Sequence, residues 1–254
     1  MPARRIIPCL DVKDGRVVKG VQFRGYEIVG DVLECALLYA REGADELVLY
    51  DIAASTEGRS LDPSTIREIA RRIDVPFAVA GGLRTVEQAI SCLENGADKI
   101  SINSPALERP EFIDELARIA GAQCVVVGVD SFEEEGEYYV YQYTGDETKS
   151  RCSGRATFEW LREIEDRGAG EVVLNCMNRD GMRAGYDLRQ LAKARSILNV
   201  PLIASGGAGE MEHFFDVFSE ADVSGALAAS VFHKGLFSIP DLKKYLRQTG
   251  LEIR

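Results

Sequence analysis

This sequence of 254 residues contains few histidines and lacks the common cofactor-binding motifs. It contains one tryptophan and two histidines, His213 and His233. Neither histidine has a partner at the spacing of a metal-ligand pair, and no G-x-S-x-G motif is present. The chain also lacks a Walker A motif and a G-x-G-x-x-G fingerprint. We therefore expect no metal, no cofactor and no serine triad.

Basic residues and long apolar runs are also scarce. Lys and Arg number 30 against 41 Asp and Glu, so the formal charge is -11, and neither a nucleic acid nor an anionic membrane is an expected partner. No uncharged apolar run approaches the roughly 20 residues that span a bilayer, and Asp11 interrupts the first apolar run before it resembles a secretory signal. The six cysteines show no paired short spacing. We expect a reduced, cytoplasmic protein.

Short β-branched runs alternate with amphipathic segments along the whole chain. The expected strands cover residues 5–10, 46–51, 76–80, 99–103, 123–129, 171–176, 201–205 and 224–229. The expected helices cover residues 31–42, 63–73, 86–95, 110–120, 155–167, 188–198, 211–220 and 239–249. This number of strand–helix units is typical of a (β/α)8 TIM barrel, whereas an open doubly wound sheet usually has fewer.

The two halves of the sequence resemble each other. GADELVLYDIAA at 43–54 aligns with GAGEVVLNCMN at 168–178, and residues 77–104 align with 202–230. Internal similarity of this kind predicts two duplicated half-barrels, about 1–121 and 122–254, that close a single barrel domain.

Two aspartates occupy equivalent positions in this repeat: Asp11 ends the first expected strand and Asp130 ends the fifth. The C-terminal ends of barrel strands converge at one mouth, where active sites lie. Two carboxylates in unequal environments can divide acid and base roles, and Lys13 or Lys19 would keep Asp11 ionised. The structural alternative is that each aspartate only caps its loop through Asx-type hydrogen bonds. A repeated pair favours chemistry.

Glycines and small polar residues follow other strands of both halves. Gly81–Gly82 and Gly206–Gly207–Ala208–Gly209 follow the third and seventh strands, and Asn103–Ser104 and Ala229–Ser230 end the fourth and eighth. Such turns direct backbone N–H groups at a phosphate, although they could be tight turns alone. One phosphate cradle in each half predicts a ligand with two phosphates.

Two further features of the sequence are a hairpin pattern near the mouth and a set of charged residues at the strand starts. Residues 132–146, FEEEGEYYVYQYTGD, predict a β-hairpin whose Gln142, Tyr143 and Thr144 return toward the mouth. At the opposite end, strands begin with charges of both signs, which would form a closed ring of ion pairs; these residues are Arg5, Glu46, Lys99 and Glu171. Spacing alone favours a structural plug for this ring.

These residues occur in segments that resemble a known family from about residue 4 onward. RIIPCLDVKDGRVVKG, GADELVLYDIAAS, ADKISINSPAL, QYTGD, PLIASGGAG and GALAASVFH are similar to the cyclase subunit of imidazole glycerol phosphate synthase, an enzyme of histidine biosynthesis. The paralogous phosphoribosylformimino-aminoimidazole carboxamide ribotide isomerase shares the half-barrels, the aspartates and the phosphate sites. The DVKDGRVVKG loop and the charged ring favour the cyclase. A non-catalytic phosphosugar-binding scaffold subunit is the alternative outside the enzymes.

The resemblance implies a lyase reaction. Ammonia from a glutaminase partner would cross the barrel and attack a bisphosphorylated ribulosyl formimino-aminoimidazole carboxamide ribotide, which yields imidazole glycerol phosphate and aminoimidazole carboxamide ribotide. Asp11 and Asp130 would carry the acid–base catalysis. The implied substrate and phosphate contacts are Lys19, Asp51, Gly82, Asn103, Ser104, Asp180, Gly181, Ser205, Gly207, Ala229 and Ser230.

The resemblance also changes the meaning of the charged ring. Arg5, Glu46, Lys99 and Glu171 would gate ammonia from a glutaminase docked in a heterodimer, with Asp98 and Gln123 near the contact. The sequence departs from the family pattern at three ligand-site positions. They are Asn178, where many members have Asp, Asn175, where Thr occurs, and Ala80, in place of the first Gly of a G-G-G run.

Overall fold

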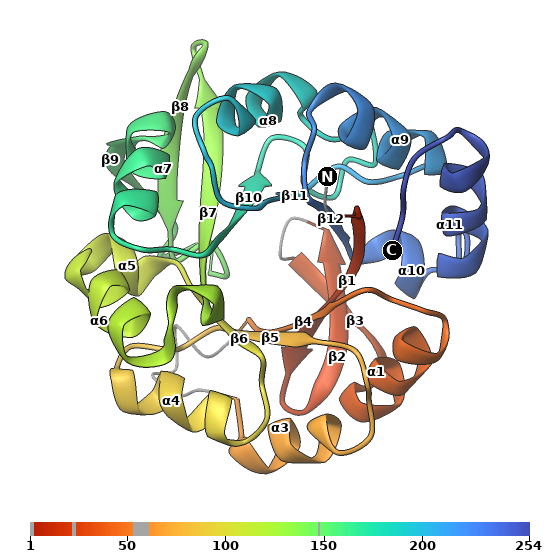
Figure 1. Cartoon of the computed structure of the whole chain (residues 1–254), viewed down its shortest axis with the longest axis horizontal. Coiled ribbons are helices and arrows are strands. Elements are labelled where there is room, and N and C mark those ends of the chain that lie inside the picture. The colour runs from red at the N-terminus through yellow and green to blue at the C-terminus, as the bar shows by residue number, and fades with distance from the viewer. Residues whose placement is uncertain (1–2, 22–23, 53–60, 147) are drawn as a thin grey trace.

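The computed structural model describes residues 3–21, 24–52, 61–146 and 148–254. Within these residues, eight parallel strands pair in a closed circle and form the predicted (β/α)8 barrel (Figure 1). In order around the barrel they are β1 (Arg5–Lys13), β4 (Leu47–Asp51), β5 (Phe77–Ala80), β6 (Lys99–Ile102), β7 (Val125–Glu134), β10 (Glu171–Cys176), β11 (Leu202–Ser205) and β12 (Gly225–Ala228).

Helices form the outer layer around this barrel (Figure 1). They are α1 (Val32–Arg41), α3 (Pro63–Ala70), α4 (Val86–Glu94), α5 (Ser104–Glu108), α6 (Glu111–Ala120), α7 (Thr157–Asp166), α8 (Leu188–Arg195), α9 (Met211–Glu220), α10 (Ser230–His233) and α11 (Ile239–Gln248), with a short 3₁₀ turn η1 (Ala122–Cys124). Side-chain caps explain several starts, because Asp62 accepts the N–H of Ser64 and Thr85 forms a capping box with Gln88. None of the helices in the described residues is long and apolar enough to cross a membrane.

The apolar residues form two layers, as the two-residue period of a strand requires. The larger layer lies between the strands and the helices and includes Ile6, Leu10, Leu47 and Leu49. The smaller layer fills part of the barrel interior and consists of Ile7, Cys9, Val48, Ala78, Ala80, Ile203 and Leu227. Alternate residues of one strand therefore face the helices and the interior.

The structure contains strands that the sequence patterns did not predict. β1 continues to Lys13 and turns through Asp14 and Gly15 into β2 (Arg16–Val21), which pairs with β3 (Arg24–Asp31). Asp14 and Gly15 both have positive φ, 49° and 72°, the geometry of a two-residue hairpin turn.

The predicted hairpin after the fifth barrel strand is present as β7 and β8 (Glu137–Gln142). An additional strand, β9 (Arg151–Ala156), pairs with β8. The division of the barrel into two duplicated halves remains a prediction.

Candidate active site

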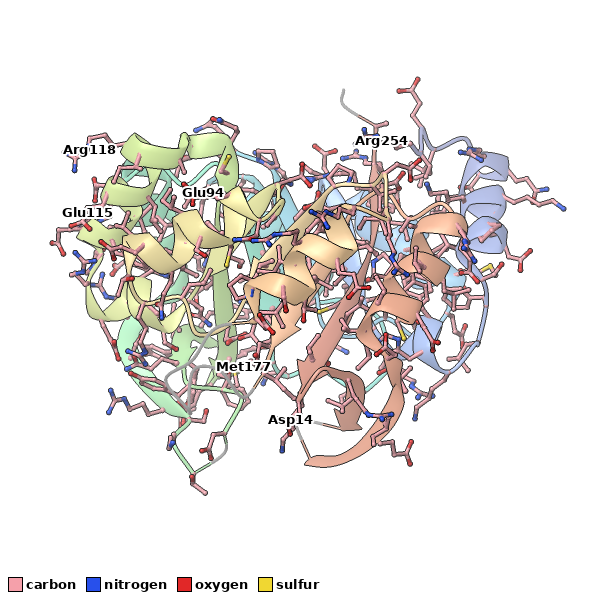
Figure 2. All side chains as sticks on the ribbon, turned by 90° about the horizontal axis from the view of Figure 1, so that it is seen from below. Asp14, Glu94, Glu115, Arg118, Met177 and Arg254 are labelled. Carbon is pink, nitrogen blue, oxygen red and sulfur yellow. The ribbon has the colours of Figure 1, made fainter. Side chains whose placement is uncertain are left out.

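The two ends of the barrel differ in the side chains that they present. In Figure 2, Asp14 and Met177 lie at one end of the molecule and Arg254 lies at the other. Asp14 follows β1 and Met177 follows β10, so the first end is the C-terminal mouth of the barrel. Active sites of this fold are built there.

One cavity reaches from this mouth through the barrel interior. Its wall contains Asp11 and Asp130 at the mouth and Glu46 and Glu171 at the beginnings of the strands. The cavity volume is about 170 Å³. One water molecule needs roughly 10–15 Å³ of such space, so the interior has room for several molecules the size of water or ammonia.

The carboxyl group of Asp130 is held by three donors from three different segments. Asn103 Nδ2 donates to Oδ2 at 2.7 Å, Thr144 Oγ1 donates to the same oxygen at 2.5 Å, and Asn175 Nδ2 donates to Oδ1 at 2.9 Å. Burial raises the pKa of Asp130 above its ordinary value, while the Thr144, Asn175 and Asn103 hydrogen bonds oppose this rise. Asp130 is therefore fixed in position and has a stronger affinity for a proton than a solvated aspartate.

Asp11 has a different environment. It is only partly buried, and the thiol of Cys9 lies 3.5 Å from its Oδ1. Tyr50 is paired in register with Asp11 across β1 and β4 and also lines the cavity. Burial and the nearby negative charges of Asp130 and Asp11 raise the pKa of Tyr50, which keeps the phenol neutral. The two aspartates are thus unequal, as acid–base partners need to be.

Glycine turns approach the same mouth from two sides. Gly81 and Gly207 have φ of +97° and +110°, and a Cβ on either would lie 2.2 Å from a main-chain oxygen, that of Asp51 or Gly185. Only glycine fits such positions. The short helices α5 and α10 begin at Ser104 and Ser230, directly after β6 and β12.

Most of the residues that the sequence singled out contribute to one cavity wall. They are Asp11, Gly82, Asn103, Ser104, Asp130, Asp180, Gly181, Ser205, Gly207, Ala229 and Ser230. Asp51 is buried and lies outside this wall, and the side chain of Lys19 lies outside the described part of the structure. Among the described residues, no cluster of His, Cys, Asp or Glu is placed to hold a metal ion.

Sequence reasoning missed Cys9 and Tyr50. Their signal was the two-residue period of a strand: if Glu46 faces the interior, Val48 and Tyr50 do so as well.

The structure places all three departures from the family pattern. Asn175 donates to Asp130 and accepts a hydrogen bond from Ser205 at 3.2 Å. Asn178 binds both the N–H and the C=O of Glu133 on β7, at 2.7 and 3.1 Å, and Ala80 is a buried part of the cavity wall.

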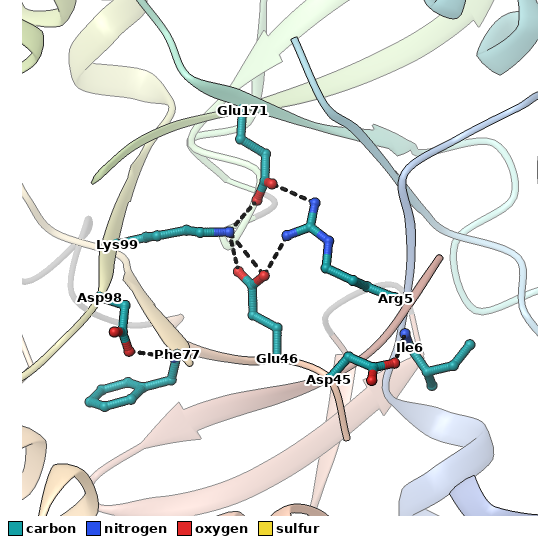
Figure 3. A network of polar contacts seen from close by, with 8 residues as sticks. All are labelled: Arg5, Ile6, Asp45, Glu46, Phe77, Asp98, Lys99 and Glu171. Atoms are coloured by element: carbon teal, nitrogen blue, oxygen red, sulfur yellow. Dashed lines mark hydrogen bonds and ion pairs between the residues drawn. The ribbon is translucent and has the colours of Figure 1, made fainter. Parts of the chain in front are cut away.

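The charged residues at the bottom form the closed ring that the sequence predicted (Figure 3). Arg5 donates to Glu46 and to Glu171, both at 2.6 Å. Lys99 Nζ donates to both oxygens of Glu46 at 2.8 and 2.9 Å and to Glu171 at 3.0 Å. Positive and negative groups alternate, so each charge is paired twice.

Burial also shifts the pKa of ring members. It raises the pKa of Glu46, as does the negative charge of Glu171, while Lys99 and Arg5 lower it. Burial would lower the pKa of Arg5, but Glu171 and Glu46 outweigh it and raise that pKa. Between the ring and the aspartates, the cavity wall is mainly apolar, with Ile7, Val48, Ala78, Val126, Val173, Ile203 and Leu227.

A cavity with two unequal carboxylates at the C-terminal mouth defines a (β/α)8-barrel enzyme. A family model described as "Histidine biosynthesis protein" matches residues 5–238. The chain belongs to this histidine biosynthesis protein family.

Several curated relatives are similar over their whole length. The imidazole glycerol phosphate synthase subunit HisF of Vibrio cholerae is 58% identical over 256 aligned residues, which cover 100% of both chains. The subunit of the same name from Aliivibrio salmonicida is 59% identical with the same coverage. That of Cronobacter sakazakii is 60% identical and is covered to 99%.

Proposed function

We propose that this chain is the cyclase subunit of imidazole glycerol phosphate synthase. It converts the bisphosphorylated ribulosyl formimino-aminoimidazole carboxamide ribotide and ammonia to imidazole glycerol phosphate and aminoimidazole carboxamide ribotide. The observation that carries the proposal is the single cavity with paired aspartates at one end and a closed charged ring at the other. The similarity to synthase subunits along the entire chain supports it.

In this proposal, Asp11 and Asp130 are the catalytic residues. The reaction moves protons on and off nitrogen and oxygen without redox change, which is the work of a general acid and a general base. Burial raises the pKa of Asp130 above its ordinary value, so the role of proton donor is assigned to Asp130 and proton removal to the less buried Asp11. Lys19 and Asp51 complete the substrate site in the family pattern.

The two phosphates of the substrate bind on opposite sides of the mouth. Gly82, Asn103 and Ser104 hold one phosphate with backbone N–H and side-chain donors. The second phosphate is held by a larger group, which consists of Asp180, Gly181, Ser205, Gly207, Ala229 and Ser230. Support comes from the positive-φ turns and from the cavity that these residues share. Asn103 also donates to Asp130, so this amide links a phosphate site to the catalytic carboxyl group.

Ammonia reaches the site from the opposite end. A glutaminase docks on the bottom face as the heterodimer partner, with Asp98 and Gln123 near the contact. Arg5, Glu46, Lys99 and Glu171 form the gate, and the apolar wall above them carries a small neutral molecule to the aspartates. The protein works in the cytoplasm, without a cofactor.

The isomerase alternative shares the aspartates and phosphate turns, but it has no need of a gated route for ammonia. A scaffold subunit without catalysis has no need of an acid–base pair either. These considerations, and the names of the relatives, favour the cyclase.

The test is turnover of the bisphosphorylated ribotide by the isolated chain with ammonium salt at alkaline pH, followed by the loss of substrate absorbance. Wild type should turn over, and Asp11→Asn or Asp130→Asn should reduce the rate by about 10²–10⁴-fold, the contribution of a positioned acid or base. Absent turnover by wild type, or full turnover by Asp11→Asn, would refute the mechanism. Lys99→Ala should lower glutamine-dependent turnover in the complex far more than ammonia-dependent turnover; equal losses would reduce the ring to a structural role.

A further inference from the structure

Two aspartates tie neighbouring strands together beside the charged ring (Figure 3). The N–H of Asp45 donates to the main-chain oxygen of Ile6 at 3.1 Å, and the N–H of Ile6 donates back to Asp45 Oδ2 at 2.8 Å. Asp98 and Phe77 repeat this arrangement, with both distances 3.0 Å. We call each reciprocal pair of hydrogen bonds a strand bracket. Each bracket comes one residue before a ring member, Glu46 or Lys99.

The bracket of Asp45 differs from that of Asp98 because it is buried and charge-paired. Lys243 on α11 donates from Nζ to Asp45 Oδ1 at 2.6 Å, and both residues are less than a tenth exposed. Asp98 is exposed. The two oxygens of Asp45 are therefore shared between a strand amide and an outer helix, so α11 is connected directly to the start of the barrel.

Lys243 reaches the ring by a second route. Its Nζ also donates to the main-chain oxygen of Arg254 at 3.0 Å. Arg254 N donates to the oxygen of Arg4 at 3.1 Å, and Arg4 N donates to the oxygen of Glu252 at the same distance. One ammonium group thus holds the residue before Glu46 and, through Arg254, the residue before Arg5.

Glu171 is a ring member that has no strand bracket before it. Gly170 precedes it, and a Cβ there would lie 2.1 Å from the oxygen of Ala122. Close backbone packing fixes that strand start. Arg5 is paired with β12, because its N–H donates to the oxygen of Ser224 at 3.2 Å. Between β1 and β4, the Asp45 bracket precedes the first register pair, Cys9 with Val48, and lies beside the Arg5–Glu46 ion pair.

Packing energy alone does not explain a buried Lys–Asp pair, because apolar replacements of buried ion pairs are often as stable. The contribution of the pair is to hold the strand starts that carry Arg5 and Glu46 in position. A displacement of about 1 Å would stretch the Arg5–Glu46 contact from 2.6 Å to roughly 3.6 Å, beyond the range of a hydrogen bond. The neighbouring contacts of Lys99 with Glu46 would be lost with it.

We propose that Lys243 and Asp45 are positioning residues of the charged ring: their ion pair and bracket hold Arg5 and Glu46 where the ring closes. The inference rests on the gate role proposed above. It assigns to an outer helix, α11, control over the route that ammonia takes into the barrel.

The test compares two variants in the complex with the glutaminase. Lys243→Met combined with Asp45→Asn removes the ion pair without leaving an unpaired buried charge, and the amide oxygen introduced by Asp45→Asn would still accept from the N–H of Ile6. Lys243→Arg keeps the charge and the donors. The ratio of glutamine-dependent to ammonia-dependent turnover should fall about tenfold in the first variant, as expected for misplaced groups, and should stay near the wild-type ratio in the second.

Controls separate this effect from general destabilisation. Leu246→Ala, at a fully buried position on the same helix, should lower the melting temperature but leave the ratio unchanged. Hydrogen exchange of the Ile6 amide should accelerate in the Met/Asn variant, because the acceptor at position 45 is then a neutral amide that Lys243 no longer anchors, and should remain slow in Leu246→Ala. If the Met/Asn variant does not fold, Asp45→Asn alone weakens the same contact and should lower the ratio in the same direction.

A wild-type ratio in the folded Met/Asn variant or in Asp45→Asn, together with a lowered ratio in Lys99→Ala, would overturn the positioning role and leave the gate intact. An unchanged ratio in Lys99→Ala would overturn the gate itself, and this inference with it. The turnover of wild type with ammonium salt is separate from both results, so the cyclase proposal is judged independently.

Discussion

Removal of Lys99 from the charged ring should destabilise the barrel in a pH-dependent way. The Lys99 ammonium makes three contacts of 2.8–3.0 Å with Glu46 and Glu171, whose side chains are 5% and 7% exposed. Removing one partner of a buried ion pair costs about 3–5 kcal/mol. At about 2–4 °C per kcal/mol for a domain of this size, Lys99→Met should lower the melting temperature by roughly 6–20 °C.

The sign of the pH dependence follows from Glu46. Burial and Glu171 already raise its pKa above the ordinary value of 4.5, and the loss of Lys99 removes a charge that lowers it. A carboxyl group whose pKa is raised in the folded state lowers the free energy of unfolding least below its ordinary pKa. It lowers this free energy more as the pH rises through the raised value. The deficit in melting temperature of Lys99→Met should therefore be small near and below the ordinary carboxyl pKa and should grow as the pH rises above it.

The assay is thermal unfolding of wild type and Lys99→Met from about pH 4, just below the ordinary carboxyl pKa, up to about pH 8. Lys244→Met, at an exposed position of α11, is the matched control and should follow wild type at every pH. A deficit that does not change with pH, or one of less than about 2 °C, would show that the ring is not a buried, coupled set of charges.

Three further predictions concern the mouth of the barrel. Thr144→Val removes a donor to Asp130, so the pKa of Asp130 should rise and the alkaline limb of the kcat–pH profile, where the proton donor is lost, should move to higher pH; an unmoved limb contradicts the role of Asp130. Gly207→Ala forces a Cβ to 2.2 Å from an oxygen and should raise KM about tenfold or more, whereas Gly250→Ala, with φ of +88° and open space, should not. Asn178→Asp loses a donor to Glu133 and should cost about 1 kcal/mol in urea unfolding.

The barrel could be predicted from the sequence because its strands and helices carry regular apolar periods. The segment 171–176 was bounded correctly, because residues that pack against the helices (Val172, Leu174 and Cys176) alternate with residues that line the interior (Glu171, Val173 and Asn175). The strands β2 and β3 were missed, although Asp14–Gly15, the turn from β1 into β2, is a recognised hairpin signal. β2 and β3 are rich in charged residues and glycine, so they lack the apolar pattern that marked the barrel strands.

The site was only partly predictable. Repeat position identified Asp11 and Asp130, and strand-start charge identified the ring, because both signals are local. The donors to Asp130 come from positions 27, 14 and 45 residues away in the sequence, and no local pattern relates them. Lys243 lies 198 residues from Asp45, so its contact with the start of the barrel appears only once the chain has closed on itself.

The cyclase reaction inserts the nitrogen of ammonia into an imidazole ring. The most direct measurement supplies ¹⁵N-ammonium and the bisphosphorylated ribotide to the isolated chain and analyses the products by mass spectrometry. Each molecule of imidazole glycerol phosphate should contain one ¹⁵N, and an equal amount of aminoimidazole carboxamide ribotide should contain none. Unlabelled imidazole glycerol phosphate, or label in the carboxamide ribotide, would contradict this reaction.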